Sequence, residues 1–400
     1  MSLLAKKGNL SYLGIDIGTA SIKMVELENY NGQPKLRTYG YADVTSNVLR
    51  GTVEKNNQAI ADYVNLIAQK ANVKTKKVIA ALPTFSVFNF IINLPNMPKK
   101  DLDAAVKWEA KKFIPLPIEE MILDRKILNK EDNKEDKKSV GDLLKKEIAK
   151  PEEKKPEEKK PEEKKPEEKK PEEKKPEEKI VGPIEAKAKN FKILLTAAPK
   201  SLVSRYIDIF KKAQLNLLSL ETESFALSRA LLGNDKSIVM IVDLGATTTD
   251  ICVVEGGVPI LNRGIDTGGE FITKSIMNSL NISLDRADQF KRDFGLSVED
   301  TNKSVPAIIK KSLDFIINEI KYAFELYQRQ GNNKIDKIIL SGGSAFLPNL
   351  PNYLTELLGL PVIIGDPWDR IIYPLDLKPI LSDIGPRMAT CIGLSMRDIN

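Results

Sequence analysis

Two stretches of the chain place an aspartate, a glycine and small hydroxyl residues, in that order, directly after an apolar run. The first reads Leu13-Gly14-Ile15-Asp16-Ile17-Gly18-Thr19-Ala20-Ser21, and the second reads Ile241-Val242-Asp243-Leu244-Gly245-Ala246-Thr247-Thr248. A carboxylate in this position can hold a hydrated Mg²⁺ ion, and a glycine lets backbone N–H groups approach phosphate oxygens closely. The two stretches therefore predict turns that could face one nucleotide from opposite sides.

A third stretch, Ile338-Ile339-Leu340-Ser341-Gly342-Gly343-Ser344, is again an apolar run that ends in paired glycines. Paired glycines can pass close to a flat base or a ribose. Each turn alone is common in α/β domains, so its ordinary interpretation is a tight turn. Three turns in this order, with the first two duplicated, predict a nucleotide clamped between two halves of the chain.

The elements that must position these turns also fall into two halves. Residues 12–83 alternate strand, turn, strand and helix, whereas residues 237–264 contain strands and residues 270–331 contain helices. Between the halves, residues 88–94 and 191–197 have the pattern of strands, each followed by a helical segment. The pattern predicts a small α+β subdomain inserted into the first half.

In their order the three turns resemble the phosphate-1, phosphate-2 and adenosine motifs of the actin-like ATPase superfamily. Within it, the chain resembles the PilM family of type IV pilus assembly proteins, which have an FtsA-like layout. The similarity covers nearly all of the chain outside one insertion, and it includes residues 108–110, 114–120, 220–227, 267–270 and 392–397. The resemblance implies an α/β, actin-like (ribonuclease H-like) fold of two duplicated domains with an inserted small α+β subdomain.

The resemblance also implies boundaries for these domains. Actin-like domain 1 would comprise residues 10–84, 216–236 and 371–400, and domain 2 would comprise residues 237–370, with an outer helical subdomain at 265–331. The inserted, partner-binding subdomain would span residues 85–215 and would carry a disordered low-complexity insert at residues 130–185.

The low-complexity insert is built around residues 150–179, which repeat Lys-Pro-Glu-Glu-Lys six times. The repeat has no apolar side chain to bury, and a proline at every fifth position interrupts helix hydrogen bonding, so the segment is expected to be disordered. It is either a docking arm for another component or a tolerated loop expansion, because long surface insertions cost little loop entropy.

The resemblance implies ATP and Mg²⁺ as cofactors and assigns binding roles to individual residues. The first turn would bind phosphate through Asp16, Gly18, Thr19, Ala20, Ser21 and Lys23, and the second through Asp243, Gly245, Ala246, Thr247 and Thr248. Ribose and base would be approached by Gly268, Gly269, Gly342, Gly343 and Ser344, with Lys274 on the following helix. Asp16 and Asp243 would hold Mg²⁺ through water, whereas Lys23 has the alternative of being a solvated strand residue.

Hydrolysis would need a further group that orients water, and the connecting helix offers Glu221 and Glu223. Position favours Glu223 as the catalytic residue. The alternative is a helix-start carboxylate that interacts with backbone N–H groups. ATP binding is therefore predicted, and turnover, which would be slow ATPase activity at most, is left open.

Composition limits the function classes. The formal charge is +6, from 61 basic and 55 acidic residues, so nucleic-acid binding is not expected. Histidine is absent, which excludes histidine-based hydrolase triads and metal sites. Cys252 and Cys391 read as buried thiols of a cytoplasmic protein, and no signal peptide or uncharged run of about 18 residues is visible.

The resemblance implies that the chain binds the cytoplasmic N-terminal tail of PilN, in a groove beside the inserted subdomain that involves residues 88–123. Apolar surface there would come from Trp108, Phe113, Ile114, Leu116 and Ile118, and the alternative is that these side chains form the subdomain core. Other pilus assembly proteins are expected as partners and self-association is left open. The protein is expected to reach the inner face of the cell membrane only through its partner.

Three other functions were weighed against the pilus scaffold. An FtsA-like cell-division protein would be expected to end in an amphipathic membrane helix, which the ending Asp398-Ile399-Asn400 does not show. A sugar-kinase-like enzyme would need an aspartate base against a substrate hydroxyl, and no segment resembles that site. An Hsp70-like chaperone would need a further β-rich domain after residue 400.

Overall fold

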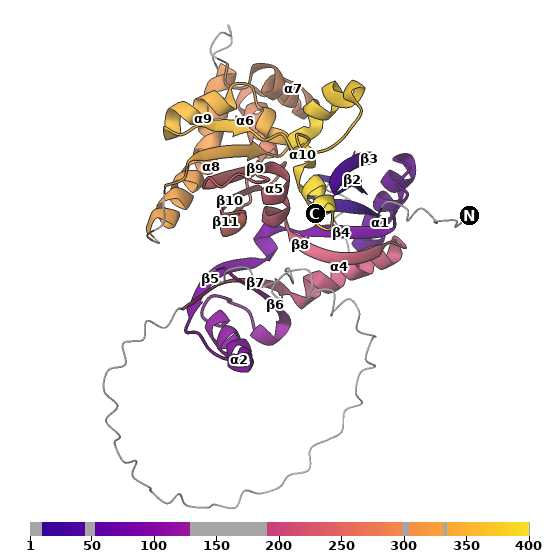
Figure 1. Ribbon diagram of the computed structural model, residues 1–400. Coiled ribbons are helices and arrows are strands. Elements are labelled where there is room, and N and C mark those ends of the chain that lie inside the picture. The colour runs from indigo at the N-terminus through magenta and orange to yellow at the C-terminus, as the bar shows by residue number, and fades with distance from the viewer. Residues whose placement is uncertain are drawn as a thin grey trace, which may run out of the picture.

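The computed structural model describes residues 10–44, 53–128, 190–297, 304–329, 331 and 334–399. The predicted insert at residues 130–185 lies outside the described residues. The described residues form two five-stranded sheets with helices on their faces and a smaller three-stranded sheet beside them (Figure 1).

The first sheet consists, in order across the sheet, of β3 (Gln33–Asp43), β2 (Ser21–Tyr30), β1 (Ser11–Ile17), β4 (Lys77–Leu82) and β8 (Asn216–Thr222). β1, β2 and β3 are antiparallel neighbours, and β4 runs parallel to both β1 and β8. β1 and β4 are nearly continuous apolar runs because helices cover both faces of this part of the sheet.

The second sheet repeats this arrangement with β11 (Val258–Ile265), β10 (Thr249–Glu255), β9 (Val239–Leu244), β12 (Lys337–Ser341) and β13 (Val362–Ile364). Again the first three strands along the chain are antiparallel neighbours, and the fourth runs parallel to the first and the fifth. The two halves therefore share one topology, as a duplicated fold predicts.

The outer face of each sheet has its own helices. The first sheet packs against α1 (Val53–Lys70) and α4 (Lys200–Lys212), so α4 joins the core of the first half although it lies within the predicted 85–215 segment. The second sheet is covered by α6 (Gly269–Leu280), α7 (Leu284–Phe294), α8 (Ser304–Arg329) and α9 (Leu350–Leu358).

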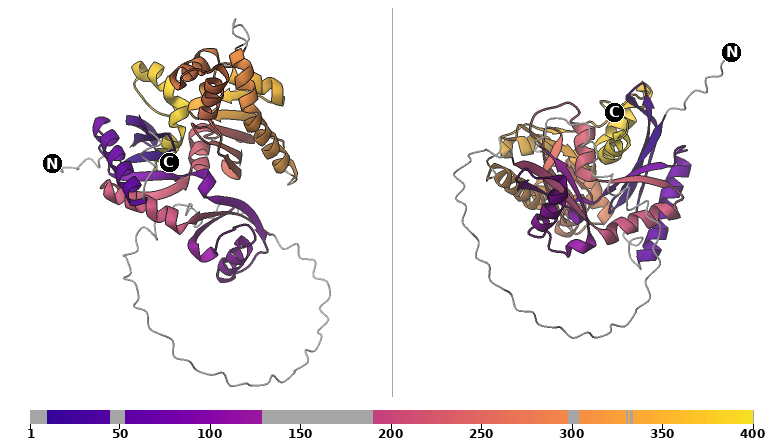
Figure 2. Two further views of the ribbon diagram at one scale, coloured as in Figure 1. Left: turned by 180° about the vertical axis from the view of Figure 1, so that it is seen from behind. Right: turned by 60° about the horizontal axis from the view of Figure 1, so that its bottom comes forward.

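Two helices, α5 (Glu223–Leu231) and α10 (Lys378–Met396), form a layer between the two sheets (Figures 1 and 2). They pack on the first sheet through residues such as Ala226 and Cys391, and on the second through Leu227 and Ala389. Glycine permits the close packing of this layer: a Cβ at Gly14 of β1 would lie 2.1 Å from the carbonyl oxygen of Cys391.

The inserted subdomain is a three-stranded antiparallel sheet of β5 (Phe88–Leu94), β7 (Phe191–Pro199) and β6 (Met121–Ile127), in that order. One face packs on α2 (Lys99–Ala110), with Ile193, Leu195 and Ala197 in the shared core. The opposite face, which carries Ala198 and Ile122, turns toward the first half. Short 3₁₀ turns complete the described chain: η1 (Thr84–Ser86), η2 (Ile118–Glu120), η4 (Gly343–Phe346) and η5 (Leu375–Leu377).

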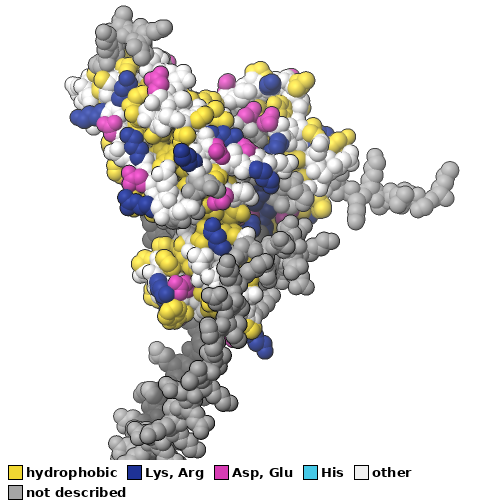
Figure 3. Space-filling model, turned by 60° about the vertical axis from the view of Figure 1, so that its left-hand side comes forward, with side chains coloured by type: hydrophobic (Ala, Val, Ile, Leu, Met, Phe, Trp, Pro, Cys, Tyr) yellow, Lys and Arg dark blue, Asp and Glu magenta, His cyan; other side chains and the backbone are white. Residues whose placement is uncertain are grey.

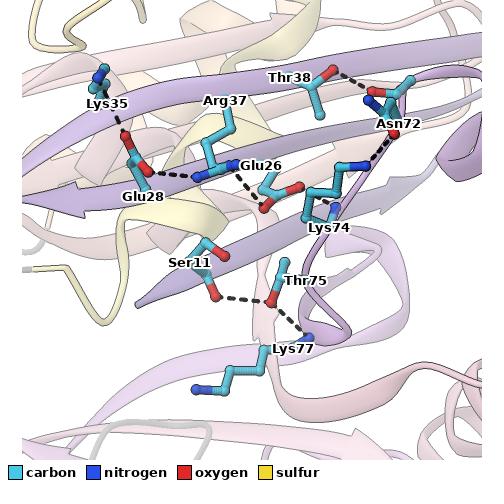
Figure 4. Close-up of polar contacts among 11 residues, drawn as sticks. Ser11, Glu26, Glu28, Lys35, Arg37, Thr38, Asn72, Lys74, Thr75 and Lys77 are labelled. Carbon is cyan, nitrogen blue, oxygen red and sulfur yellow. Dashed lines mark hydrogen bonds and ion pairs between the residues drawn. The ribbon is translucent and has the colours of Figure 1, made fainter. Parts of the chain in front are cut away.

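A polar network holds the loop between α1 and β4 against the outer strands of the first sheet (Figure 4). Glu26 is fully buried, accepts a hydrogen bond from the Lys74 backbone N–H at 2.8 Å and faces the Arg37 Nε at 3.6 Å. Arg37 Nη1 also donates to Glu28 at 2.8 Å. A buried carboxylate needs such partners, so the network fixes the start of β4.

On one face of the molecule, basic and acidic side chains alternate with apolar ones (Figure 3). None of the described helices is long and apolar enough to cross a membrane.

Candidate functional site

The two aspartate-glycine turns lie opposite each other with their tips in contact. In each, a glycine closes the turn: Gly18 N–H donates to the Ser21 carbonyl at 3.0 Å, and Gly245 N–H donates to the Thr248 carbonyl at 2.9 Å. The Oγ1 atoms of Thr19 and Thr247 are 2.5 Å apart. The structure thus brings together the residues predicted for both phosphate turns, namely Asp16, Gly18, Thr19, Ala20, Ser21 and Lys23 with Asp243, Gly245, Ala246, Thr247 and Thr248.

The first turn contains an internal ion pair. Asp16 and Lys23 are cross-strand neighbours on β1 and β2, and Lys23 Nζ lies 2.6 Å from Asp16 Oδ2. Their side chains are only 8% and 14% exposed. Burial alone would lower the pKa of Lys23, but the Asp16 carboxylate raises it above its ordinary value. Lys23 is therefore a charged residue of the turn and not a solvated strand residue.

At the same register position the second hairpin carries a second carboxylate, because Asp250 on β10 pairs with Asp243 on β9. Burial raises the pKa of Asp243 to about 6. Burial and the Asp243 carboxylate together raise the pKa of Asp250 to about 7. The Asp250 Oδ1 is buried and has no hydrogen-bond partner among the described residues.

This second turn fits a cation. Facing carboxylates in a half-buried site favour either a proton or a metal ion. Among the described residues, no group of three or more acidic or cysteine side chains could hold a metal by itself. An ion such as Mg²⁺ at Asp243 would therefore keep water and phosphate oxygens as further ligands, as this ion ordinarily does.

Glu223 and Glu221 have different surroundings. Glu223 opens α5, and its Oε2 accepts hydrogen bonds from the backbone N–H and the Oγ1 of Thr84, both at 2.9 Å. Burial, with the Asp250 and Asp16 carboxylates adding to it, raises the pKa of Glu223 well above its ordinary value. Glu221 is instead paired with Arg229 at 3.0 Å and Arg397 at 2.8 Å. Only Glu223 lies among the charges of the two turns.

Several of the glycines predicted to approach ribose and base support the second turn directly. Gly269 N–H donates to the Gly245 carbonyl at 3.0 Å, and a Cβ at Gly268 would lie 2.7 Å from the Gly245 and Ala246 oxygens. Gly342 has a φ of +83° and passes close to the backbone of Leu244. Ser344 Oγ donates to the Gly245 carbonyl at 3.3 Å. Gly343, by contrast, is exposed, and a Cβ there would meet nothing within 4 Å.

The two lysines on the neighbouring helices differ. Lys274, predicted from the sequence, is 56% exposed and pairs with Glu270 one turn away on α6. Lys291 on α7, which the sequence did not suggest, is 15% exposed and lies beneath the glycine turn, 2.8 Å from Thr273 Oγ1 and 3.4 Å from the Gly269 carbonyl. Sequence reasoning also missed Thr84, for which the only local signal is its position after Pro83 at the end of β4.

A small hollow separates the inserted subdomain from the first half. It is lined by side chains from β4, β6, β7 and β8, namely Leu82, Ile122, Asp124, Thr196, Ala198, Leu220, Glu221 and Thr222. Half of these residues are apolar, and two carboxylates lie among the others. The lining strands β4 and β8 are the ones that lead directly to Thr84 and Glu223.

The apolar residues predicted to line a partner groove lie elsewhere, around α2 on the other face of the small sheet. Trp108, Phe113 and Leu116 are 65%, 50% and 43% exposed. Ile114 is buried in the subdomain core, and Ile118 is partly buried against it. Both interpretations therefore apply to this segment. Trp108, Phe113 and Leu116 are surface side chains, whereas Ile114 and Ile118 belong to the subdomain core.

The profile of a known family, described as type IV pilus assembly protein PilM, matches residues 14–144 and 177–399. The chain belongs to the PilM family. The part without a match, residues 145–176, falls outside the described residues and covers most of the Lys-Pro-Glu-Glu-Lys repeat at residues 150–179.

Solved structures support the fold. A PilM–PilN type IV pilus biogenesis complex is similar to this PilM family member with a TM-score of 0.73 and 22% identity, over 98% of this chain and 99% of that one. The ethanolamine utilization protein EutJ from Carboxydothermus hydrogenoformans has a TM-score of 0.50 and 15% identity, over 96% of this chain and 89% of EutJ. The predicted actin-like, duplicated α/β fold is confirmed.

Two cell-division proteins are also similar in sequence. Cell division protein FtsA of Enterococcus faecalis is 24% identical over 379 residues, which cover 88% of this chain and 78% of FtsA. FtsA of Enterococcus hirae is 24% identical over 385 residues, which cover 90% of this chain and 78% of FtsA. These similarities fit the FtsA-like layout and, at this identity, show a common superfamily and not a cell-division function.

Proposed function

We propose that this PilM family member is a cytoplasmic, ATP-binding, actin-like scaffold of the type IV pilus inner-membrane assembly complex, and that it binds the cytoplasmic N-terminal tail of PilN. The main observation in support of nucleotide binding is the contact between the two duplicated turns, with 2.5 Å between Thr19 Oγ1 and Thr247 Oγ1. Membership of the PilM family supports the assignment to pilus assembly.

In this proposal the two turns divide the recognition of phosphate between them. Backbone N–H groups and hydroxyls of Thr19, Ser21, Thr247 and Thr248 donate hydrogen bonds to phosphate oxygens, and Lys23 contributes a fixed positive charge. Asp16 and Asp243 would hold Mg²⁺ through water, and the ion would supply positive charge that neutralises phosphate. Gly343 leaves room beside the third turn for ribose or base.

Glu223 is the residue that would orient an attacking water, because it is the carboxylate of α5 that lies among these charges. Thr84 fixes its Oε2 through two hydrogen bonds, which leaves Oε1 for water. A Glu223→Gln variant keeps the shape and the acceptor for Thr84. We expect it to bind nucleotide normally and to lose whatever slow ATPase activity the wild type has, measured as phosphate release.

For the partner, we propose the hollow between the inserted subdomain and the first half. Leu82, Ile122, Ala198 and Leu220 give this hollow an apolar wall beside the inserted subdomain, which suits the apolar side chains of an extended peptide. The solved PilM–PilN complex supports the identity of the partner. Attachment to the membrane would follow from PilN, which would place the chain at the inner face of the cell membrane.

The nucleotide proposal is tested by calorimetric titration of ATP with Mg²⁺ into the wild type and into Asp243→Ala. We expect the variant to bind at least roughly tenfold more weakly, because a charged ligand of the ion is lost. Asp314→Ala, an exposed aspartate on α8, is the matched control and should bind like the wild type. Equal affinities for all three proteins would contradict the nucleotide site.

The partner proposal is tested by titrating a peptide of the PilN cytoplasmic N-terminus. Ile122→Asp places a charge in the hollow, whereas Trp108→Ala removes an exposed ring on the opposite face of the subdomain. We expect only Ile122→Asp to abolish binding. Loss of binding in Trp108→Ala instead would move the partner site to the α2 surface, and circular dichroism would establish that both variants fold.

A further inference from the structure

Two consecutive residues in the middle of α10 contact opposite halves of the molecule. The Pro386 carbonyl accepts a hydrogen bond from the Gly342 N–H at 3.0 Å and one from Ser341 Oγ at 3.1 Å. The next residue, Arg387, pairs with Asp43 at the end of β3 and lies over the ring of Tyr41, 4.4 Å from its centroid. Pro386 therefore contacts the turn at Gly342 in the second half, and Arg387 contacts β3 in the first half.

The Arg387 contacts are next to the first phosphate turn. Asp43 is the cross-strand partner of Ser21, and the Val44 N–H donates to the Ala20 carbonyl at 2.8 Å. Tyr41 is likewise the cross-strand partner of Lys23. Arg387 thus fixes α10 at the edge of the strands that carry the turn.

The Pro386 contacts lead to the second phosphate turn. Gly342 packs on the backbone of Leu244, and Ser344 Oγ donates to the carbonyl of Gly245. The path Asp43, Arg387, Pro386, Gly342 and Leu244 therefore joins the two phosphate turns through α10, in addition to the direct contact between Thr19 and Thr247.

We propose that Arg387 is a positioning residue for the nucleotide site, which holds α10 so that the third and second turns stay in place against the first. This inference rests on the proposed nucleotide-binding function. Asp43 is 75% exposed and Arg387 is 27% exposed, so their pair contributes little to folding itself. Its effect is on the relative placement of the two halves, and neither residue touches the nucleotide.

The test uses the contact between the turn tips as a reporter that needs no nucleotide. With Thr19→Cys and Thr247→Cys, two thiols replace hydroxyls 2.5 Å apart, and mild oxidation should join them as a disulfide. The native Cys252 and Cys391 are both buried, so they give little background. The rate of disulfide formation in the full chain then measures how often the two halves are closed.

Into this background we would introduce Arg387→Ala, Asp43→Ala and Arg387→Lys, and separately the charge exchange of Asp43→Arg with Arg387→Asp. Loss of the ion pair together with the cation–π contact predicts disulfide formation about fivefold slower in Arg387→Ala, and loss of the ion pair alone predicts about twofold slower formation in Asp43→Ala. Arg387→Lys and the charge exchange should recover part of the rate. Arg286→Ala, which removes another exposed arginine lying over a ring, is the matched control and should leave the rate unchanged.

Without the added cysteines, each alanine variant should bind ATP and Mg²⁺ more weakly by about the same factor as its disulfide formation slows. Unchanged disulfide rates in Asp43→Ala and Arg387→Ala would overturn the proposal. If Arg387→Ala fails to fold, Asp43→Ala decides alone, since its side chain is mostly in solvent. Slower disulfide formation in a chain that binds no nucleotide would uphold the coupling and reject the nucleotide function.

Discussion

The two halves of the molecule share a backbone and differ in charge at one equivalent position. Both hairpins close with a glycine N–H bonded to the carbonyl three residues on, and both place an aspartate at the end of their first strand. Opposite that aspartate the first half carries Lys23 and the second half carries Asp250. Topology alone therefore does not assign the same task to the two turns.

Because of this difference, the two turns present different charges to a phosphate group. In the first half the Asp16 charge is already compensated by a lysine at 2.6 Å, so the turn is electrically complete without a ligand. In the second half Asp243 and Asp250 face each other with raised pKa values, so that turn is completed by a proton or a cation. This asymmetry predicts that the metal dependence of nucleotide binding resides mainly in the second half.

The largest expected effect comes from removing Lys23, which compensates the charge of Asp16 in the first half. Lys23→Met leaves Asp16 buried without its partner, which should lower the free energy of unfolding by about 3 kcal/mol. Urea unfolding at neutral pH would measure it. Lys35→Met is the control, because Lys35 is 39% exposed and lies 3.5 Å from Glu28, and its loss should cost less than about 1 kcal/mol. Equal losses in the two variants would contradict the buried role of Lys23.

A smaller effect of opposite sign is expected in the second half. The pKa of Asp250 rises from 3.8 to about 7 on folding. The folded protein thus binds more protons than the unfolded chain between about pH 4 and 7, and its stability falls as pH rises through this window. Asp250→Asn removes this contribution, so at pH 8 and without metal it should be more stable than the wild type by on the order of 2 kcal/mol.

Urea unfolding of Asp250→Asn and wild type at pH 5 and pH 8 would measure the change in slope. Asp314→Asn is the matched control and should follow the wild type at both values. An Asp250→Asn variant whose stability depends on pH as steeply as that of the wild type would show that folding does not raise the pKa of Asp250.

The smallest effect is expected where the fourth strands of the two halves end. In the first half β4 leads into Thr84, whereas in the second half β12 leads into Gly342 and Gly343. Gly343→Ala should change stability by less than about 0.5 kcal/mol, because the added Cβ meets open space. Gly342→Ala should cost several times more, because of its positive φ and the nearby Leu244 oxygen. Thermal unfolding of both variants would compare them, and similar melting temperatures would rule out this distinction.

Much of the fold could be predicted from the sequence because its signals are local. The three apolar runs before the turns became β1, β9 and β12. The helices predicted in residues 270–331 include α8, whose buried face carries Ile309, Leu313, Ile316, Ile320 and Tyr327 at helical spacing. Each of these follows from the spacing of side chains within one element.

What the sequence did not predict depends on contacts between distant segments. Thr84 bonds Glu223 across 139 positions, and Arg387 bonds Asp43 across 344. Asp250 became important only through its strand register with Asp243. The exposed position of Trp108 is likewise set by the packing of α2 on the small sheet and not by its neighbours in sequence. The chemical roles of the site residues remain predictions for the experiments above.

The layer formed by α5 and α10 has a consequence for the order of events during synthesis. α10 covers the inner faces of both sheets, yet it comes from residues 378–396, long after the strands that it packs against. Until those residues leave the ribosome, the apolar inner faces of both halves lack part of their cover. Partly made chains that expose such surface are prone to aggregate. Nascent chains of this protein are therefore expected to depend on holding chaperones until translation has passed α10.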